Sequence, residues 1–297
     1  MMLDKLKTET RNPDTMHLDC MNVSEILKTM NYEDAKVPET IAQELPRIEE
    51  AVKLVIRSFE KGGRLIYAGA GTSGRLGVLD AVECKPTFGV SNDMVRGVIA
   101  GGDKAFTEAV EGAEDSEEAG AMECDNLSIS PEDTVVALAA SGRTPYAIGL
   151  LKAAEKRGVS TVSICCNKGA EMSQYASVAI ELETGPEVLT GSTRLKAGTA
   201  QKLVLNMIST TSMIGVGKVY QNLMVDVQPT NKKLVERSKR IIMEATEASY
   251  EEANVAFEKA KGHVKTAIVM VLLGCNYDEA VNQLKENKGF IRKTVDK

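Results

Sequence analysis

The sequence predicts an α/β protein built on a doubly wound, parallel β-sheet. From Arg64 onward, short apolar runs alternate with segments in which apolar residues have the helical period. Five such runs occur, at residues 65–68, 94–100, 134–140, 160–166 and 178–182. Four of the five are nearly continuous, as is typical of strands covered on both faces. Strands of this kind alternating with helices predict a parallel sheet between two helical layers.

Helical segments precede and follow the predicted sheet. Residues 1–20 show no period and are expected to form an ordered arm or coil, and helices are predicted at residues 23–30 and 41–59. Lys61-Gly62-Gly63 ends the second of these helices. Within the sheet region a helix is predicted at residues 144–157, and a long one with a thin polar face at 192–217. Four more are predicted after Pro229, at residues 232–248, 250–261, 264–273 and 277–286.

These patterns predict three parts of the chain. Residues 1–60 form an N-terminal arm and helices that pack on the core, residues 61–245 form the sheet domain, and residues 246–297 form a small C-terminal helical bundle. The composition of the 297 residues, with 43% hydrophobic residues, is that of a chain able to bury a sizeable core.

Composition also limits the function. A formal net charge of -6 argues against a general nucleic-acid binder, which would need to neutralise phosphates. The best apolar run, Ala267 to Leu273, is far shorter than the roughly 20 residues of a membrane helix. The polar N-terminus lacks the apolar stretch of a secretory signal, so the protein is expected to be cytoplasmic.

Metal and histidine chemistry are not indicated. The six cysteines form no C-x-x-C pair, and reduced thiols are expected in a chain of this size. His17 and His263 are the only histidines, and both lie outside the glycine-rich centre of the chain. We therefore expect neither a metal nor a zinc site, and assign acid–base chemistry to carboxylates, lysines or tyrosines.

A glycine-rich loop follows the first predicted strand. Residues 69–74 read G-x-G-x-x-G, the dinucleotide fingerprint, at a strand-to-helix turn. The ribose-binding acid that should follow by about 20 residues is missing, because the candidate, Asp103, lies 32 residues beyond Gly71. Thr72 and Ser73 could instead bind a compact phosphate at the helix N-terminus. Phosphate monoester binding is the favoured interpretation, and dinucleotide binding and a plain glycine-rich turn remain open.

Two further hydroxyl-rich turns precede predicted helices. Ser141-Gly142-Arg143-Thr144-Pro145 follows the third strand, with Thr144 suited to an N-cap and Pro145 to the first helical turn. Gly191-Ser192-Thr193-Arg194 begins the long helix. Each alone could be a capped helix, but three such turns predict one anionic ligand at the C-terminal edge of the sheet.

These motifs resemble the sugar isomerase (SIS) domain, a flavodoxin-like fold that binds phosphosugars. The resemblance is closer to the N-acetylmuramic acid 6-phosphate etherase family, and covers about Thr8 to Val227 and, more weakly, the C-terminal helices. The resemblance is carried first by the three turns, of which the third continues as G-S-T-R-L-K-A-G-T. Four further segments match: T-E-T-R-N-P at residues 8–13, E-C-K-P-T-F-G at 83–89, E-G-A-E-D at 111–115 and G-P-E-V-L-T-G-S-T-R at 185–194. Val82 and Lys85 depart from the family pattern, where we expect Ser and Pro, and both flank Glu83 without replacing it.

The resemblance implies cleavage of the ether that joins D-lactate to C3 of the sugar, releasing N-acetylglucosamine 6-phosphate, in peptidoglycan recycling. No metal or redox cofactor is implied. Elimination through the open-chain aldehyde, followed by addition of water, needs a base for C2 and an acid for the leaving oxygen. The family's catalytic positions fall on Glu83, expected to be the acid, and Glu114, expected to be the base for C2 or for water. Composition alone would place Glu114 on a solvated acidic face.

The remaining site residues are expectations on the same basis. Glu187 is expected to contact the sugar near C1, and Lys196 to bind the lactyl carboxylate. Phosphate ligands are expected to be hydroxyls and backbone N–H groups of Thr72, Ser73, Ser141, Thr144, Ser192 and Thr193, with Arg143 and Arg194 as further candidates.

The position of Glu83 raises a question of geometry. A helix that starts at Ser73 would place Glu83 about 15 Å along its axis, at 1.5 Å per residue. Either that helix breaks early, as Gly77 could allow, or Glu83 serves the site of a neighbouring subunit, and we expect a homodimer with sites at the interface. Two rival functions keep the same phosphate loops: a non-catalytic phosphosugar sensor, and an aldose–ketose isomerase that needs no leaving-group acid.

Overall fold

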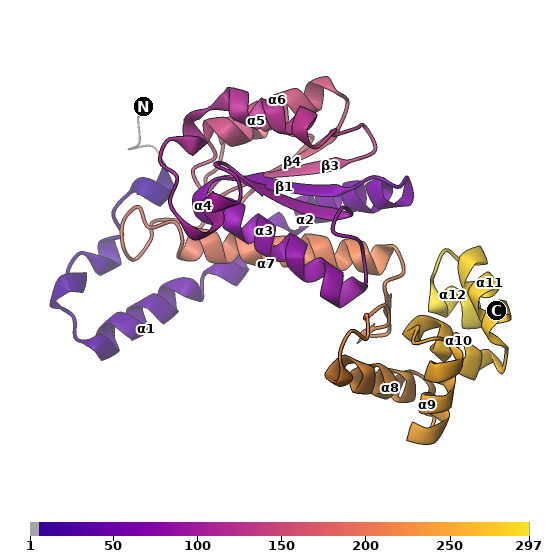
Figure 1. Cartoon of the computed structure of the whole chain (residues 1–297). Helices are drawn as coiled ribbons and strands as arrows, with labels where there is room; N and C mark the ends of the chain where they lie inside the picture. The colour runs from indigo at the N-terminus through magenta and orange to yellow at the C-terminus, as the bar shows by residue number, and fades with distance from the viewer. Residues whose placement is uncertain (1–5, 297) are drawn as a thin grey trace. The chain divides into compact units, whose positions relative to one another are not determined.

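The protein is described by a computed structural model of residues 6–296, drawn in Figure 1. By its internal contacts the chain divides into two compact units. Residues 6–82 and 93–209 form the first, called the sheet unit, and residues 83–92 and 210–296 form the second, called the helical unit.

The sheet unit contains the predicted parallel sheet. Its strands match the five predicted apolar runs: β1 (Leu65–Gly69), β2 (Val95–Ile99), β3 (Thr134–Leu138), β4 (Ser160–Cys165) and β5 (Val178–Glu181). All pairs are parallel, in the order β2-β1-β3-β4-β5. This is the flavodoxin-like order, in which ligands bind where the strand order reverses, here at the carboxyl ends of β1 and β3. Gly69, the last residue of β1, lies opposite Leu138 of β3.

Helices cover both faces of this sheet (Figure 1). On one side lie α5 (Glu117–Asn126) and α6 (Pro145–Lys156), and on the other α3 (Gly71–Phe88) and α7 (Lys196–Gly215). The α5–α6 pair packs closely because both helices have glycine at the contact. A Cβ on Gly120 would lie 1.9 Å from the carbonyl oxygen of Tyr146, and one on Gly149 would lie 1.9 Å from that of Glu117.

Within the sheet unit, α3 and α7 are joined by a partly buried hydrogen bond. Ser209 donates a hydrogen bond to Asp80 (Oγ–Oδ1 3.2 Å), and burial raises the pKa of the Asp80 carboxyl, although hydrogen bonds from Tyr67 and Ser209 oppose the rise. α2 (Val37–Glu60) contacts β1, β3 and β5, and α1 (Val23–Asp34) precedes it. The shorter helices are α4 (Lys104–Thr107), η5 (Ala113–Asp115) and η6 (Glu171–Tyr175).

The N-terminal segment is an ordered arm where the structure describes it. It consists of three short 3₁₀ turns, η2 (Lys7–Glu9), η3 (Pro13–Thr15) and η4 (Leu18–Cys20). Asn12 caps η3 by accepting a hydrogen bond from the backbone of Asp14 (2.9 Å). Residues 1–5 of the predicted arm lie outside the described residues.

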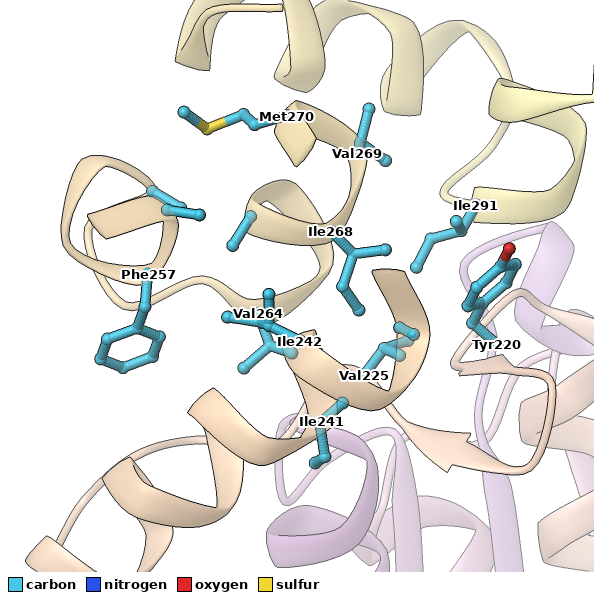
Figure 2. Close-up of a cluster of buried hydrophobic side chains, with 14 of the residues drawn as sticks. Tyr220, Val225, Ile241, Ile242, Phe257, Val264, Ile268, Val269, Met270 and Ile291 are labelled. Carbon is cyan, nitrogen blue, oxygen red and sulfur yellow. The ribbon is translucent and has the colours of Figure 1, made fainter. Parts of the chain in front are cut away.

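The helical unit holds a hairpin and five helices among its described residues. The hairpin pairs β6 (Val219–Tyr220) with β7 (Leu223–Met224), and the helices are α8 (Lys232–Thr246), α9 (Tyr250–Lys259), α10 (Val264–Leu273), α11 (Tyr277–Glu286) and α12 (Ile291–Val295). Their buried side chains form one hydrophobic cluster, which includes Ile242 of α8, Phe257 of α9 and Ile268 of α10 (Figure 2). The cluster extends to Tyr220 and includes side chains of α8, so α8 packs with the C-terminal helices. From the sequence, the C-terminal helical bundle was expected to begin at residue 246.

A buried lysine and a tightly packed glycine both contact Asp226 in the helical unit. Lys265 is buried and donates hydrogen bonds to Asp226 (Nζ–Oδ2 2.6 Å) and to the Gly217 carbonyl (2.9 Å). Gly89, which follows α3, has a φ of +64° and so little space that a Cβ would lie 2.2 Å from the carbonyl oxygen of Asp226. No helix among residues 6–296 combines the length and the apolar character of a membrane span.

Candidate functional site

The glycine loop turns the chain sharply from β1 into α3. Gly71 has a φ of +52°, a left-handed conformation that favours glycine. Gly74 is packed so tightly that a Cβ would lie 2.5 Å from the carbonyl oxygen of Gly69. The turn places the free N–H groups at the start of an 18-residue helix beside the point where the strand order reverses. Such a helix start is typical of anion sites, and anion binding by this loop stays a prediction.

Thr72 and Ser73 lie against the start of α7. Ser73 is buried, and its hydroxyl donates a hydrogen bond to Gln201 (Oγ–Oε1 2.8 Å). A Cβ on Gly198 would lie 3.5 Å from Cγ2 of Thr72. The first and third predicted loops are therefore neighbours. Sequence reasoning missed Gln201, whose buried amide nitrogen has no partner within residues 6–296, because nothing distinguishes it in the helical pattern.

The Ser141 loop joins β3 to α6. Ser141 accepts a hydrogen bond from the backbone of Arg143 (Oγ–N 3.2 Å), and Gly142 has a φ of +71°. Thr144 occupies the predicted N-cap position before Pro145, but its hydroxyl makes no capping hydrogen bond. Arg143 is half-buried and has no ion-pair partner in the described part of the chain. The Thr144 hydroxyl and the Arg143 guanidinium thus lie in one loop at the same sheet edge as the glycine loop.

The third loop ends in a turn rather than in the predicted first helical turn. α7 begins at Lys196, four residues after the expected start at Ser192. The Ser192 N–H donates to the Leu189 carbonyl (3.0 Å), and the Gly198 N–H in the first turn of α7 donates back to the Thr193 carbonyl (2.9 Å). Ser192 and Thr193 are half-buried, and Arg194 is exposed.

Glu187 and Lys196 are buried at the start of α7. Glu187 accepts hydrogen bonds from the backbone N–H groups of Lys196 and Ala197, both at 2.9 Å. Burial raises the pKa of this carboxyl, although these two hydrogen bonds oppose the rise. The Lys196 ammonium lies 2.5 Å from Glu33 of α1, and all three residues are at most 2% exposed. Glu187 and Lys196 were expected to bind the sugar and the lactyl carboxylate directly. In the structure both side chains are already engaged with other groups of the protein.

Glu114 lies in a pocket beside the glycine loop. The pocket has a volume of about 180 Å³, and its lining includes Ala70, Gly71, Arg75, Glu108, Glu111 and Glu114. Arg75 of α3 holds the segment after α4 in place by donating to the carbonyl oxygens of Phe106 (3.0 Å) and Glu108 (3.2 Å). Glu114 is exposed in η5, so its carboxylate is accessible to a ligand in this pocket.

Glu83 is exposed on the last part of α3, in the helical unit. α3 continues unbroken to Phe88, so the early break considered at Gly77 does not occur. Gly77 has a packing role instead, because a Cβ there would lie 2.9 Å from Cβ of Tyr67 on β1. Glu83 therefore stands about three turns beyond Gly71 along one helix.

The N-terminal arm is attached to two of the predicted loops. Asn167, which follows β4, donates to the hydroxyl of Thr8 (3.1 Å) and to the carbonyl oxygens of Ala140 (3.2 Å) and Ser141 (3.5 Å). Asn12 donates to the carbonyl oxygen of Pro186 (3.4 Å). Sequence reasoning did not single out Asn167, since a lone Asn after a strand carries no pattern of its own.

The buried thiols are poor nucleophiles. Burial raises the pKa of Cys165 to about 12 and holds the pKa of Cys166 well above its usual value. Within residues 6–296, no group of three His, Cys, Asp or Glu side chains is arranged to hold a metal ion. The chemistry available at this sheet edge is that of carboxylates, hydroxyls, backbone N–H groups and arginines.

Comparisons with known proteins agree with this architecture. Residues 105–210 match the SIS domain family, and residues 47–155 match the family described as the glucokinase regulatory protein N-terminal SIS domain. Two solved structures, each 16% identical with a TM-score of 0.50, share the fold over 65% of this chain. One is a ligand complex of a protein from E. coli CFT073, and the match covers 93% of that chain. The other is a candidate phosphosugar isomerase involved in capsule formation from Bacteroides fragilis NCTC 9343, and the match covers 91% of that chain.

Fold and loops define the chain as a SIS-domain protein. It is 76% identical over 296 residues to the N-acetylmuramic acid 6-phosphate etherase of Shouchella clausii (strain KSM-K16), with all of both chains covered. It is 64% identical over 294 residues to the etherase of the same name from Bacillus cytotoxicus, covering 99% of this chain and 100% of that one. The chain belongs to the N-acetylmuramic acid 6-phosphate etherase family.

Proposed function

We propose that this protein is a carbon–oxygen lyase that converts N-acetylmuramic acid 6-phosphate and water into N-acetylglucosamine 6-phosphate and D-lactate. Identity of 76% to an etherase over the full length is the observation that carries this proposal. The anion site at the strand-order reversal supports it, because a phosphosugar substrate presents a phosphate monoester.

The phosphate is bound at the three neighbouring loops. Backbone N–H groups at the start of α3 and the Thr72 hydroxyl provide the first set of donors. The Ser73 hydroxyl, which donates to Gln201 here, joins them by exchanging that partner for the phosphate. Ser141, Thr144 and Arg143 provide the second, and Ser192 and Thr193 the third. Glu187 and Lys196 act indirectly, because they hold the first residues of α7 against the glycine loop.

Catalysis follows from two carboxylates acting on an open-chain aldehyde. Glu114 removes the C2 proton or activates the incoming water from the pocket beside Gly71. Glu83 protonates the C3 oxygen as D-lactate departs, and water then adds to the unsaturated aldehyde at C3. The net reaction consumes one water and needs no change in oxidation state of a cofactor.

The unbroken helix favours a homodimer in which Glu83 serves the partner's site. About three turns of helix separate Glu83 from the glycine loop of the same chain. Mixing Glu83→Ala with Glu114→Ala subunits tests this arrangement. Heterodimers should regain up to one working site if the two carboxylates come from different chains, and no recovery after proven subunit exchange contradicts sharing.

The activity itself is tested by D-lactate release from N-acetylmuramic acid 6-phosphate. Wild type should release lactate, and Glu83→Ala and a reaction without enzyme should not. Folded wild-type protein that binds the phosphosugar but releases no lactate would contradict the proposal and favour a phosphosugar sensor.

A further inference from the structure

A second pocket of the sheet unit lies between the N-terminal arm and the segment that follows Glu187. Its volume is about 460 Å³. It is lined by Arg11, Asn12, Thr15, Met16, Leu18, Asp19, Val188, Leu189 and Thr190. The lining thus combines the apolar residues Val188, Leu189 and Met16 with one cationic residue, Arg11. None of the phosphate ligands proposed above is part of this pocket.

Side chains on both sides of Arg11 connect the arm to loops of the proposed substrate site. Thr8, three residues earlier, is fully buried and accepts a hydrogen bond from Asn167, which also donates to the Ser141 carbonyl. Asn12, the next residue, is buried and donates to the Pro186 carbonyl. Arg11 is therefore held between the Ser141 loop and the loop that leads to Ser192.

Arg11 is free to bind a ligand, whereas the cation first expected to do so is not. Lys196 is buried and paired with Glu33. Arg11 is exposed and has neither an ion pair nor a hydrogen bond to any residue between 6 and 296. Asp19, which lines the same pocket, is not within ion-pair distance of it. A planar guanidinium without a partner matches a carboxylate, which it can bind through two parallel hydrogen bonds.

We infer that this pocket binds the lactyl group of the substrate, with Arg11 as the residue that recognises its carboxylate. The methyl of the lactyl group packs on Val188 and Leu189, two apolar residues of the pocket lining. The inference rests on the proposed etherase function and deepens it, because it makes Arg11 a specificity determinant for the leaving group.

The test compares two substrates that differ only at the lactyl carboxylate. One is N-acetylmuramic acid 6-phosphate, and the other is its carboxamide. Arg11→Ala should lower kcat/KM for the acid by about 10- to 100-fold, as expected for loss of a charged hydrogen-bonded pair, and change that for the carboxamide by less than about threefold. Arg11→Lys should fall between wild type and Arg11→Ala on the acid, since an ammonium keeps the charge but not the paired geometry.

Lys7→Ala is the matched control. Lys7 is a cation on the same arm, but its side chain is exposed, is paired with Glu183 at 3.6 Å and is not part of the pocket. It should leave both substrates unaffected. Equal losses for the acid and the carboxamide in Arg11→Ala would show a structural role for Arg11, and an unchanged kcat/KM for the acid would show that another group binds the carboxylate. Either result overturns the inference.

Binding of D-lactate separates this inference from the etherase reaction. Saturation-transfer NMR with wild type should detect D-lactate, and the signal should disappear in Arg11→Ala but not in Lys7→Ala. If wild type released no lactate from the substrate yet bound D-lactate through Arg11, the etherase reaction would fail while the carboxylate site stood. If the enzyme cleaved the acid and the carboxamide equally well and bound no D-lactate, the carboxylate site would be overturned while the etherase reaction stood.

Discussion

The Glu33 carboxylate of α1 lies 2.5 Å from the Lys196 ammonium at the first residue of α7, and neither side chain is more than 3% exposed. The backbone N–H of Lys196 is held in turn by Glu187 at 2.9 Å. Two carboxylates from distant parts of the chain thus fix the start of α7, the helix whose first turns adjoin the glycine loop. The geometry of the proposed phosphate site therefore depends on this buried network.

Removing the charge of Glu33 should destabilise the protein strongly. Glu33→Gln leaves the Lys196 ammonium buried without its counter-charge, which costs about 3–5 kcal/mol in comparable pairs. Urea denaturation monitored by circular dichroism measures the free energy of unfolding. Lys36→Met is the control, since Lys36 also pairs with Glu33 but its side chain is 42% exposed, and it should cost less than about 1 kcal/mol.

Replacing both charges should recover most of that loss. A Glu33→Leu, Lys196→Met double variant keeps the packing and buries no charge, and such replacements are often neutral or stabilising. If the double variant were as unstable as Glu33→Gln, the loss would come from packing of α1 rather than from an unpaired ammonium.

The same pair predicts a dependence of stability on pH. Burial favours the neutral form of Glu33, but the hydrogen bonds from Lys196 and Lys36 prevail and hold the pKa of Glu33 below its usual value of 4.5. The unfolded chain therefore binds a proton at higher pH than the folded chain does. The stabilisation is fully present above about pH 4.5 and is lost as the pH falls through the lower, folded pKa. Wild type should lose more stability than the double variant between pH 6 and pH 3, and parallel losses would contradict this assignment.

Two glycines of the glycine loop should respond differently to substitution by alanine. Gly74→Ala places a Cβ 2.5 Å from the Gly69 carbonyl oxygen and 2.7 Å from Ile99, and should cost about 3 kcal/mol. Gly71→Ala meets no atom within 4 Å and should cost about 1 kcal/mol, because only its positive φ is unfavourable. Thermal and urea unfolding of the two variants measure the difference. Similar losses would show that the loop relaxes around the added methyl group.

The strands were predictable because buried parallel strands have no polar alternation. Val135, Val136 and Ala137 of β3 are all fully buried, so the whole run is apolar and its limits can be seen in the sequence. The start of α7 was not predictable from the same pattern. Ser192 and Thr193 are residues typical of a helix start, but Glu187 caps the helix from a distance at Lys196 instead. A cap provided by a residue nine positions away has no local signal.

The candidate site likewise has parts that the sequence could predict and parts that it could not. Hydroxyls in the three loops could be predicted because each loop follows a recognisable strand or precedes a helix. The engagement of Lys196 could not, since its partner Glu33 is 163 residues away and lies beyond the predicted end of the first helix. The long-range contacts of Asn167 with Thr8 were hidden for the same reason. Pairing between charged or amide side chains that lie far apart in the chain leaves no trace in the local periodicity around each partner.

The two carboxylates proposed as catalytic should differ from their neighbours in their effect on activity and not in their effect on stability. Glu114 and Glu83 are both exposed, so their truncation to Ala should change the melting temperature by less than about 2 °C. Each variant should lower kcat for D-lactate release at least ~100-fold, the usual contribution of a general acid or base. Glu118→Ala and Lys85→Ala, exposed neighbours on α5 and α3, are the controls and should keep most of the activity.

Exchange at C2 distinguishes the roles of the two carboxylates. If Glu114 is the base for C2, Glu114→Ala should lose deuterium exchange at C2 of N-acetylglucosamine 6-phosphate in heavy water, because exchange needs removal of that proton and no departure of lactate. Glu83→Ala should retain exchange while losing lactate release, since protonation of the leaving oxygen plays no part in exchange. Loss of exchange in Glu83→Ala with retention in Glu114→Ala would reverse the assignment of acid and base.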